Sequence, residues 1–342
     1  MTVAERLTAA WYSPRLTLLT LAFAPLTPVF VAASALRRTL YRTGVLAVQR
    51  LAVPVVVVGN LSVGGSGKTP LVAALAHELE ARGWHPGIVS RGYGRREGQG
   101  DAVPLLVTPE TDPLRAGDEP VLLARAGFPV AVAGDRAAAA RALLVAHPHC
   151  RVILADDGLQ HYRLARDVEI AVIDAARGFG NGWRLPAGPL REGPRRLRTV
   201  DAVVALVADD AAPLPGLVDV FRMTLVGESF RRVNAPDVVA PADTFAGPGV
   251  HAVAGIGNPQ RFFTQLRALG IDAIAHPFPD HHRFAVADLA FPDARAVLMT
   301  EKDAIKCTTF ADERCWYLPV RALIDPALVV RVEEKLRGYQ AA

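Results

Sequence analysis

Short runs of aliphatic and β-branched residues alternate with longer amphipathic stretches along most of the chain. The first run, Val53 to Val58, has no polar position and predicts a strand buried on both faces of a parallel sheet. Further strands are predicted at 88–90, 130–132, 152–154, 169–173 and 202–207, and helices at 69–82, 120–126 and 136–147. Strands that alternate with helices predict an α/β fold with a mainly parallel sheet.

The pattern changes in the last third of the chain. Residues 219–241 read as extended around Gly227 and predict a two-stranded connector between domains. A second α/β unit follows, with strands at 250–255, near 273 and at 296–300, and a helix at 259–269. We therefore expect four parts: an apolar N-terminal segment (1–50), a core domain (51–218), the connector (219–241) and a smaller α/β domain (242–342).

The N-terminal segment has an uncharged apolar stretch, Leu16–Leu36, which is long enough to span a bilayer. Pro25 and Pro28 interrupt it in the middle. Arginines flank it at positions 15, 37, 38 and 42. A small-residue cleavage site does not follow convincingly, so we expect a retained, kinked segment in or on one leaflet, with its arginines on anionic headgroups. The alternative is a soluble apolar helix packed on the domain.

Composition narrows the possible classes of protein. Of 342 residues, 51% are hydrophobic and 21% charged, which supports a large core and excludes global disorder. The net charge of +4 comes mostly from Arg, which fits an anionic substrate or membrane surface. Nucleic acid is not an expected partner, because no long basic run with interleaved aromatics occurs. The cysteines, Cys150, Cys307 and Cys315, form neither a disulfide framework nor a CxxC pair and are expected to be buried thiols in a reducing compartment.

A glycine-rich loop, Ser62 to Thr69, follows the first buried strand and opens a helix. Its glycines allow backbone N–H groups to turn toward phosphate oxygens, and the helix N-terminus adds its dipole. Lys68 is expected to reach the β- and γ-phosphates, and the Thr69 hydroxyl to bind Mg²⁺. Ser62 replaces the Gly of the strict G-x-x-x-x-G-K-[ST] pattern. The predicted nucleotide-binding residues are Gly64, Gly65, Ser66, Gly67, Lys68 and Thr69.

Several acids and histidines are further candidates. Asp156 and Asp157 end the strand at 152–154, where carboxylates of a parallel sheet face a ligand and can hold Mg²⁺, although Asp-Asp-Gly is also a common turn. Asp118 precedes an apolar helix and reads, from its own segment alone, as a helix cap. Asp280 and His281 lie in a loop of the second domain, either as an acid–base pair or as a solvated loop.

Eight motifs occur in a fixed order along almost the whole chain. They are GNLSVGGSGKTP (59–70), SRGYGR (90–95), GDEP (117–120), DDGLQH (156–161), LPAGPLRE (185–192), AGIGNPQRF (254–262), FPDHHRF (278–284) and TEKDAIK (300–306). This ordered set closely resembles the tetraacyldisaccharide 4′-kinase family of lipid A biosynthesis, in which the variant at Ser62 is normal.

The resemblance implies transfer of the ATP γ-phosphate to the 4′-hydroxyl of a tetraacylated glucosamine disaccharide 1-phosphate. It also implies Mg²⁺, and residence on the cytoplasmic face of a Gram-negative inner membrane. By position, Asp118 matches the catalytic base and His281 its partner, while Lys68, Thr69, Asp156 and Asp157 match the phosphate and Mg²⁺ residues. Candidate substrate residues are Arg91, Tyr93, Glu119, Gln160, His161, Arg191 and Glu192. We expect the two domains to close before Asp118 and His281 meet, and no obligate protein partner is predicted.

Two other classes of protein share part of this pattern. A nucleotide-switch or metallochaperone NTPase has the same glycine-rich loop and parallel sheet. The base-selecting Asn/Thr-Lys-x-Asp motif of such proteins is echoed by Thr300 to Asp303, but that segment lies in the second domain, far along the chain from the loop. A membrane-tethered binding module would leave the acidic motifs without a purpose.

Overall fold

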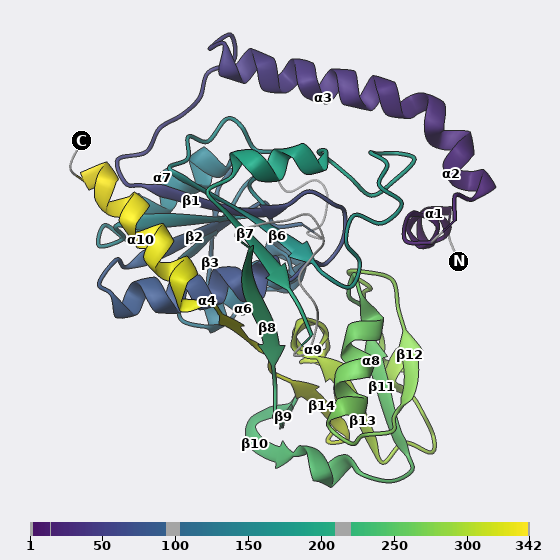
Figure 1. Ribbon diagram of the computed structural model, residues 1–342. Coiled ribbons are helices and arrows are strands. Elements are labelled where there is room, and N and C mark those ends of the chain that lie inside the picture. The colour runs from purple at the N-terminus through teal and green to yellow at the C-terminus, as the bar shows by residue number, and fades with distance from the viewer. Residues whose placement is uncertain (1–2, 14, 94–102, 209–219, 341–342) are drawn as a thin grey trace.

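The computed structural model describes residues 3–13, 15–93, 103–208 and 220–340 (Figure 1). They form two α/β units, one on a nine-stranded sheet and one on a six-stranded sheet, with a helical segment at the N-terminus. This arrangement confirms the predicted fold class, a mainly parallel sheet with a second, smaller α/β domain.

The larger sheet has the strand order β15-β8-β7-β6-β1-β5-β2-β4-β3. Its inner strands run parallel, whereas β3 and β15 pair antiparallel at the two edges. The strands are β1 (Val55–Asn60), β2 (Pro86–Ser90), β3 (Leu105–Val107), β4 (Val130–Val132), β5 (Val152–Asp156), β6 (Val168–Asp174), β7 (Ala202–Leu206), β8 (Val220–Val226) and β15 (Arg321–Ile324). The β-branched run of β1 is buried throughout, so it takes the centre of the sheet.

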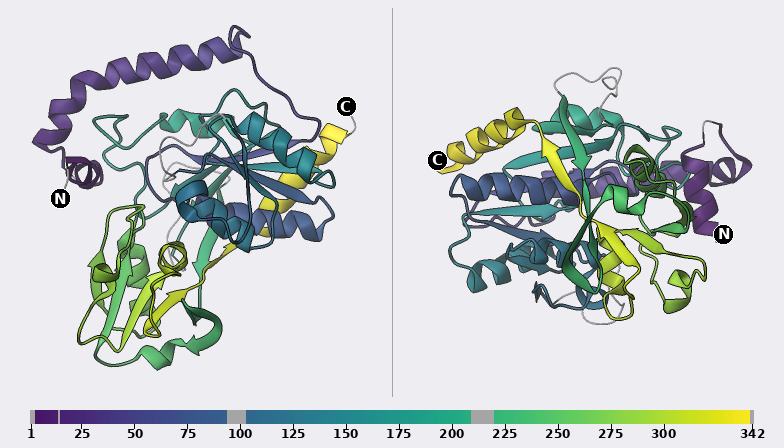
Figure 2. Two further views of the ribbon diagram at one scale, coloured as in Figure 1. Left: turned by 180° about the vertical axis from the view of Figure 1, so that it is seen from behind. Right: turned by 90° about the horizontal axis from the view of Figure 1, so that it is seen from below.

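Helices cover both faces of this sheet (Figure 2). One face carries α4 (Lys68–Ala81), α6 (Asp118–Arg125) and α10 (Pro326–Gln340), and the other carries α7 (Arg136–Ala146). A short helix, α5 (Pro113–Ala116), precedes α6. The C-terminal helix α10 belongs fully to this core, because Leu328, Val332 and Leu336 are buried in it.

The smaller sheet has the order β10-β9-β14-β13-β11-β12. Its strands are β9 (Ser229–Arg232), β10 (Ala235–Pro241), β11 (Val250–Ala254), β12 (Ile274–Pro277), β13 (Ala296–Thr300) and β14 (Cys315–Leu318). Helix α8 (Pro259–Ala268) covers one face and α9 (Glu301–Cys307) the other. The three cysteines of the chain are buried and free, as predicted.

Two adjacent crossings join the units. Strand β8 of the larger sheet continues into β9 of the smaller one, and β14 leads back to β15, where Arg321 pairs with Val226 of β8. The expected connector at 219–241 (of which 219 lies outside the described residues) is therefore divided between the two sheets. The expected domain at 242–342 likewise differs, because β15 and α10 return to the larger unit. Periodicity predicts a strand, but it does not tell which sheet the strand will join.

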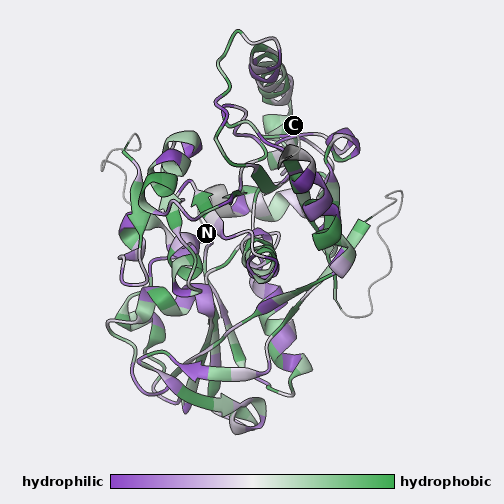
Figure 3. Ribbon diagram, turned by 90° about the vertical axis from the view of Figure 1, so that its left-hand side faces the viewer, coloured by the Kyte–Doolittle hydropathy of each residue, from purple (hydrophilic) through white to green (hydrophobic). Residues whose placement is uncertain are grey.

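The N-terminal segment consists of α1 (Val3–Trp11), α2 (Leu18–Phe23), a 3₁₀ turn (Ala24–Leu26) and α3 (Thr27–Arg42). The predicted kink falls at this turn, which contains Pro25. Helix α3 lies at the outer side of the molecule, and the loop after it returns to the body (Figures 1 and 3). From Leu18 to Arg42 the mean hydropathy reaches 1.8, yet only 6% of that apolar window is buried. So little burial does not fit a helix packed on the domain and suggests association with a membrane.

Candidate active site

The glycine-rich loop joins the central strand β1 to α4. Gly64 and Gly67 have φ angles of 109° and 85°, in the left-handed region that favours glycine. Gly67 is the N-cap of α4, so Lys68 and Thr69 form the first turn of the helix beside the loop. Ser66 is buried, and its hydroxyl has no hydrogen-bond partner among the described residues. A helix N-terminus with an unpaired buried hydroxyl suits a phosphate group.

A loop of the smaller domain packs directly on this phosphate loop. A Cβ added at Gly257 would collide with the backbone of Gly65. Beside this contact, Arg261 of α8 forms an ion pair with Asp174 at the end of β6, and Asn258 Nδ2 donates to the same carboxylate at 3.3 Å. The AGIGNPQRF motif (254–262) therefore fastens the smaller domain over the phosphate loop.

The two acids predicted to hold Mg²⁺ lie beside the loop. Asp156 ends β5 and pairs in register with Val58 of β1. Thr69 Oγ1 donates to Asp156 Oδ2 at 3.2 Å, and Lys68 Nζ lies 3.7 Å from Asp157 Oδ1. The structure thus brings the predicted phosphate and Mg²⁺ residues into one cluster.

The two neighbouring carboxyls differ strongly in acidity. Burial, followed by the nearby charge of Glu119, raises the pKa of Asp156 to about 7. Burial also disfavours ionised Asp157, but the charges of Lys68 and Arg191 outweigh it and lower the pKa of Asp157 to about 2. Asp157 is therefore an ion-paired anion at neutral pH, whereas Asp156 is the carboxyl whose ionisation a bound cation would favour.

Asp118 and His281 are in contact across the interface of the two domains. Asp118 Oδ2 lies 3.2 Å from His281 Nδ1. The N-cap of α6 is Gly117, and in the described part of the chain the Asp118 side chain makes no capping bond, so the helix-cap alternative is not seen. His281 has a φ of 59°, a strained backbone that is typical of functional sites. The expectation that the domains must close before this pair meets differs from the structure, in which the pair is already formed.

Two lysines of α9 surround this pair. Lys302 Nζ lies 3.0 Å from Glu119 Oε1, 3.3 Å from Asp280 Oδ1 and 3.4 Å from His281 Nε2. Because an ammonium group only donates, the contact with Lys302 favours the tautomer of His281 that has its lone pair on Nε2 and its proton on Nδ1, toward Asp118. Lys306 Nζ lies 3.6 Å from Asp118 Oδ2.

These cations decide the ionisation of the acid. Burial alone would raise the pKa of Asp118, but the hydrogen bond from His281 and the charges of Lys306 and Lys302 hold it below its ordinary value. Asp118 is therefore ionised at neutral pH and can accept a proton from a hydroxyl group.

Other candidate residues contact either Asp157, beside the phosphate loop, or His281, at the domain interface. Arg191 Nη1 lies 3.0 Å from Asp157 Oδ2 and 3.3 Å from Gln160 Oε1, while Gln160 Nε2 donates to Glu192 Oε1 at 2.9 Å. The Tyr93 ring packs against the His281 ring, with 4.9 Å between the two ring centroids. Gly94 and Arg95, which end the motif containing Tyr93, lie outside the described residues.

His161 and Arg91 lie near a buried arginine at the start of α7. Arg136 Nη2 donates to the Asp157 carbonyl at 3.2 Å, and Arg136 Nη1 lies 3.3 Å from His161 Nδ1. Burial, reinforced by the charge of Arg136, lowers the pKa of His161 to about 4, so its ring is neutral. Burial lowers the pKa of Arg136 to about 10; the negative charge of Asp157 opposes this shift, and the positive charge of Arg91 adds to it. Cationic side chains therefore gather around Asp157.

The N-terminal segment reaches this site at two points. Tyr12 Oη donates to the Val63 carbonyl of the phosphate loop at 2.9 Å. Near the end of α3, Arg38 Nη1 lies 3.4 Å from Glu192 Oε2. From Glu192 the polar contacts described above continue to the acids beside the phosphate loop, so the apolar segment and the site form one connected structure.

Residues 19–337 match the family model described as tetraacyldisaccharide-1-P 4′-kinase. The chain belongs to this kinase family. The tetraacyldisaccharide 4′-kinase of Azoarcus sp. is 53% identical over 92% of this chain and 91% of the relative. That of Aromatoleum aromaticum is 54% identical, with 91% and 92% covered. The crystal structure of LpxK from Aquifex aeolicus in complex with ATP has a TM-score of 0.77 at 29% identity and covers 93% of this chain and 100% of that one.

Membership of the kinase family favours substrate phosphorylation over the nucleotide-switch alternative. It also gives context to residues that sequence reasoning missed. Lys302 and Lys306 lie in the TEKDAIK motif, which belongs to the ordered set that resembles the family, but the sequence alone assigns neither lysine a role. Their spacing of four residues on a helix was a usable signal, because it places both side chains on one face. Arg136 and Tyr12 lie outside the motifs, and the sequence offers no comparable signal for them.

Proposed function

We propose that this chain transfers the γ-phosphate of ATP to the 4′-hydroxyl of a tetraacylated glucosamine disaccharide 1-phosphate, which yields the 1,4′-bisphosphate. The observation that carries the proposal is the contact between Asp118 and His281 beside the phosphate loop, because a nucleotide switch has no need of a base at that place. The kinase names of the relatives support the same reaction.

The phosphate loop and Lys68 would position the transferred phosphoryl group. Backbone N–H groups from Gly64 to Thr69 and the N-terminus of α4 offer donors for the β- and γ-phosphates, and Lys68 adds a mobile charge. Its contact with Asp157 keeps the ammonium near the loop. Phosphoryl transfer needs mainly such positioning and charge neutralisation.

Mg²⁺ fits the residues at the end of β5. The Asp156 Oδ1 oxygen is buried without a hydrogen-bond partner among the described residues. Thr69 Oγ1 donates a hydrogen bond to Oδ2 of the same carboxylate. One or two protein oxygens suit Mg²⁺, which takes its other ligands from phosphates and water. Asp156 and Thr69 would hold the ion, with Asp157 nearby, and the ion would neutralise charge on the phosphates.

Asp118 is the proposed general base. Its carboxylate would accept the proton of the 4′-hydroxyl as the oxygen attacks the γ-phosphorus. His281 orients the carboxylate through Nδ1–H, and Lys302 fixes that tautomer from the opposite side of the ring. Glu119, Arg91 and Tyr93 border this region and are proposed to contact the disaccharide or its phosphate.

A lipid-linked acceptor also accounts for the N-terminal segment. We place the enzyme on the cytoplasmic face of the bacterial inner membrane, where ATP is available, with α2 and α3 in contact with lipid. The exposed apolar side chains of Leu18, Val29 and Leu36 support this orientation.

A single incubation tests the proposed reaction. Purified protein, radiolabelled ATP, Mg²⁺ and the tetraacylated disaccharide 1-phosphate are combined in detergent, and the lipids are separated by thin-layer chromatography. We expect label in a more polar glycolipid, and a loss of about a hundredfold or more in Lys68→Ala. ATP hydrolysis that needs no glycolipid, with no labelled lipid, would instead support the switch alternative.

A further inference from the structure

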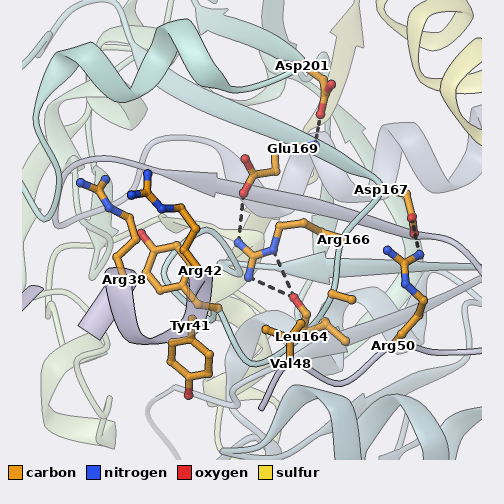
Figure 4. A pocket seen from close by; sticks show the side chains of 12 residues that line it. Arg38, Tyr41, Arg42, Val48, Arg50, Leu164, Arg166, Asp167, Glu169 and Asp201 are labelled. Carbon is orange, nitrogen blue, oxygen red and sulfur yellow. Dashed lines mark hydrogen bonds and ion pairs between the residues drawn. The ribbon is translucent and has the colours of Figure 1, made fainter. Parts of the chain in front are cut away.

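A cavity of about 450 Å³ lies where the end of α3 meets the larger domain (Figure 4). Helix α3 contributes Arg38, Tyr41 and Arg42 to its wall, and Val48 comes from the loop that follows. The opposite wall is formed by polar and apolar residues of the larger domain: Arg50, Tyr162, Leu164, Ala165, Arg166, Asp167, Glu169 and Asp201. The cavity thus lies between the apolar segment and the folded core.

The carboxylates of the cavity already have partners. Asp167 pairs with Arg50 at 3.0 Å, Glu169 with Arg166 at 3.0 Å, and Asp201 with Lys335 at 3.0 Å. In Figure 4 dashed lines join Asp167 to Arg50 and Glu169 to Arg166. The negative charge of the wall is therefore neutralised within the protein.

The arginines of α3 are much less compensated. Among the residues that the structure describes, Arg38 has one ion pair, the long contact to Glu192 at 3.4 Å, and 51% of its side chain is exposed. In the described part of the chain no carboxylate lies within ion-pair distance of Arg42, which is exposed. The two residues are four apart on α3, and Figure 4 shows their guanidinium groups extending in the same direction. Like charges at this spacing repel each other, and an anion between them would remove that repulsion.

The position of the cavity indicates the source of this anion. It opens at the end of the apolar helix, and Leu36, Val45 and Val48 around it are 61%, 70% and 47% exposed. A helix with this apolar surface would place its terminal arginines at the depth of lipid headgroups. Tyr41 and Tyr162, whose ring centroids are 6.2 Å apart, add amphipathic side chains suited to that depth.

We propose that this cavity binds the phosphate of an anionic glycerophospholipid, held by the guanidinium forks of Arg42 and Arg38. Arginine forks match phosphate oxygens in geometry, and the cavity has room for the phosphate with its glycerol group. The bound lipid seats the end of α3 at a fixed depth. This inference rests on the proposed membrane contact of α2 and α3, but not on the kinase reaction.

Vesicle co-sedimentation of the full chain tests the inference without nucleotide or glycolipid substrate. The vesicles contain phosphatidylcholine alone or phosphatidylcholine with phosphatidylglycerol. The variant is Arg42→Gln, and the matched control is Arg37→Gln, which removes the same charge from the same helix outside the cavity. At low salt both variants lose affinity for the anionic vesicles, since each basic residue near such a surface adds attraction.

High salt separates the two explanations. At about 1 M salt, surface charges more than about 3 Å apart are screened, so the effect of Arg37→Gln should vanish. Arg42→Gln should still bind the anionic vesicles about tenfold more weakly than the unmodified chain. If both variants lose affinity equally and both effects vanish in high salt, general electrostatic attraction to the surface explains the binding. That result would overturn the proposal.

Two further arms test the occupant. Binding to phosphatidylcholine vesicles should fall much less in Arg42→Gln, because the choline cation of that lipid already neutralises its phosphate; an equally large loss on these vesicles would show no preference for an anionic lipid and overturn the proposal. Soluble glycerol phosphate at millimolar concentration should not displace the anionic vesicles, because it lacks the acyl chains. Complete displacement would assign the cavity to a free phosphate and refute the lipid assignment.

Discussion

Replacing Lys302 by Met removes the cation shared by Glu119, Asp280 and His281. Across the 3.0 Å to Glu119 the Coulomb attraction is about 5 kcal/mol at an effective dielectric constant of about 20. Desolvation offsets most of it, so we take as the net loss the ~1.5–3 kcal/mol that a hydrogen bond to a charged group contributes. If the loss falls on the transition state, kcat decreases by about 10- to 100-fold.

The pH profile gives this prediction a second readout. Asp118 faces Lys302, Lys306 and His281, and the two lysine charges help to hold its pKa below the ordinary value. Without Lys302 that pKa rises. A base must be ionised to act, so the acid limb of kcat, which lies below the ordinary carboxyl pKa of 3.8 in the unmodified chain, moves to higher pH.

Steady-state kinetics from about pH 3.5 to 8, a range that reaches the ordinary carboxyl pKa of 3.8, measure both effects, with ATP and glycolipid varied separately. Lys335→Met on α10 is the matched control, because it removes the same side chain from an ion pair with Asp201 at 3.0 Å in the larger domain. Lys302→Arg keeps the charge and should keep most of the acid limb. A folded Lys302→Met enzyme with normal kcat and an unshifted profile, or with a loss confined to KM for ATP, would refute the reasoning.

Three further predictions follow from the same structure. Asp118→Ala and His281→Ala should each lower kcat severely while ATP affinity stays normal, and the double variant should be little worse than the poorer single one; multiplicative losses in kcat would show independent roles. Without added metal, Asp156→Asn should raise the free energy of unfolding at pH 8 by up to about 4 kcal/mol. The reason is that Asp156 has a pKa of about 7 in the folded protein, so its ionisation destabilises the fold increasingly as pH rises from about 4 to 7. The gain in melting temperature should therefore vanish near pH 4. Val29→Glu should weaken vesicle binding but leave thermal unfolding unchanged, since the Val29 side chain is 66% exposed, and a lower melting temperature would show that it packs inside the protein.

Local features of the site could be predicted from the sequence. The loop from Gly64 to Thr69 follows a strand that is buried throughout, so its context and its chemistry agree. The acids at the end of β5 follow from the rule that parallel strands end at one edge of a sheet. The pairing of Asp118 with His281 came only from resemblance to the family, because 162 residues separate them and neither segment alone identifies a partner.

The tertiary features were not predictable in this way. The contact of Gly257 with Gly65 depends on how two domains pack, and no local pattern encodes that packing. Tyr12 reads as part of an apolar segment, although its hydroxyl binds the phosphate loop. β15 and α10 have ordinary strand and helix patterns, and only the pairing of Arg321 with Val226 reveals that they belong to the larger sheet.

The adjacent crossings at β8 and β15 have a consequence for synthesis on the ribosome. Because the smaller domain is inserted between two paired strands, the last strand and helix of the larger domain emerge after nearly the whole chain has been made. Folding of the inserted domain brings β14 and β9 together, and this holds the ends of β8 and β15 close enough to pair. If the inserted domain folds first, it offsets the entropic cost of closing a loop of about 90 residues between β8 and β15. The ATP-binding half, although it begins near the N-terminus, is the last part of this chain to be completed.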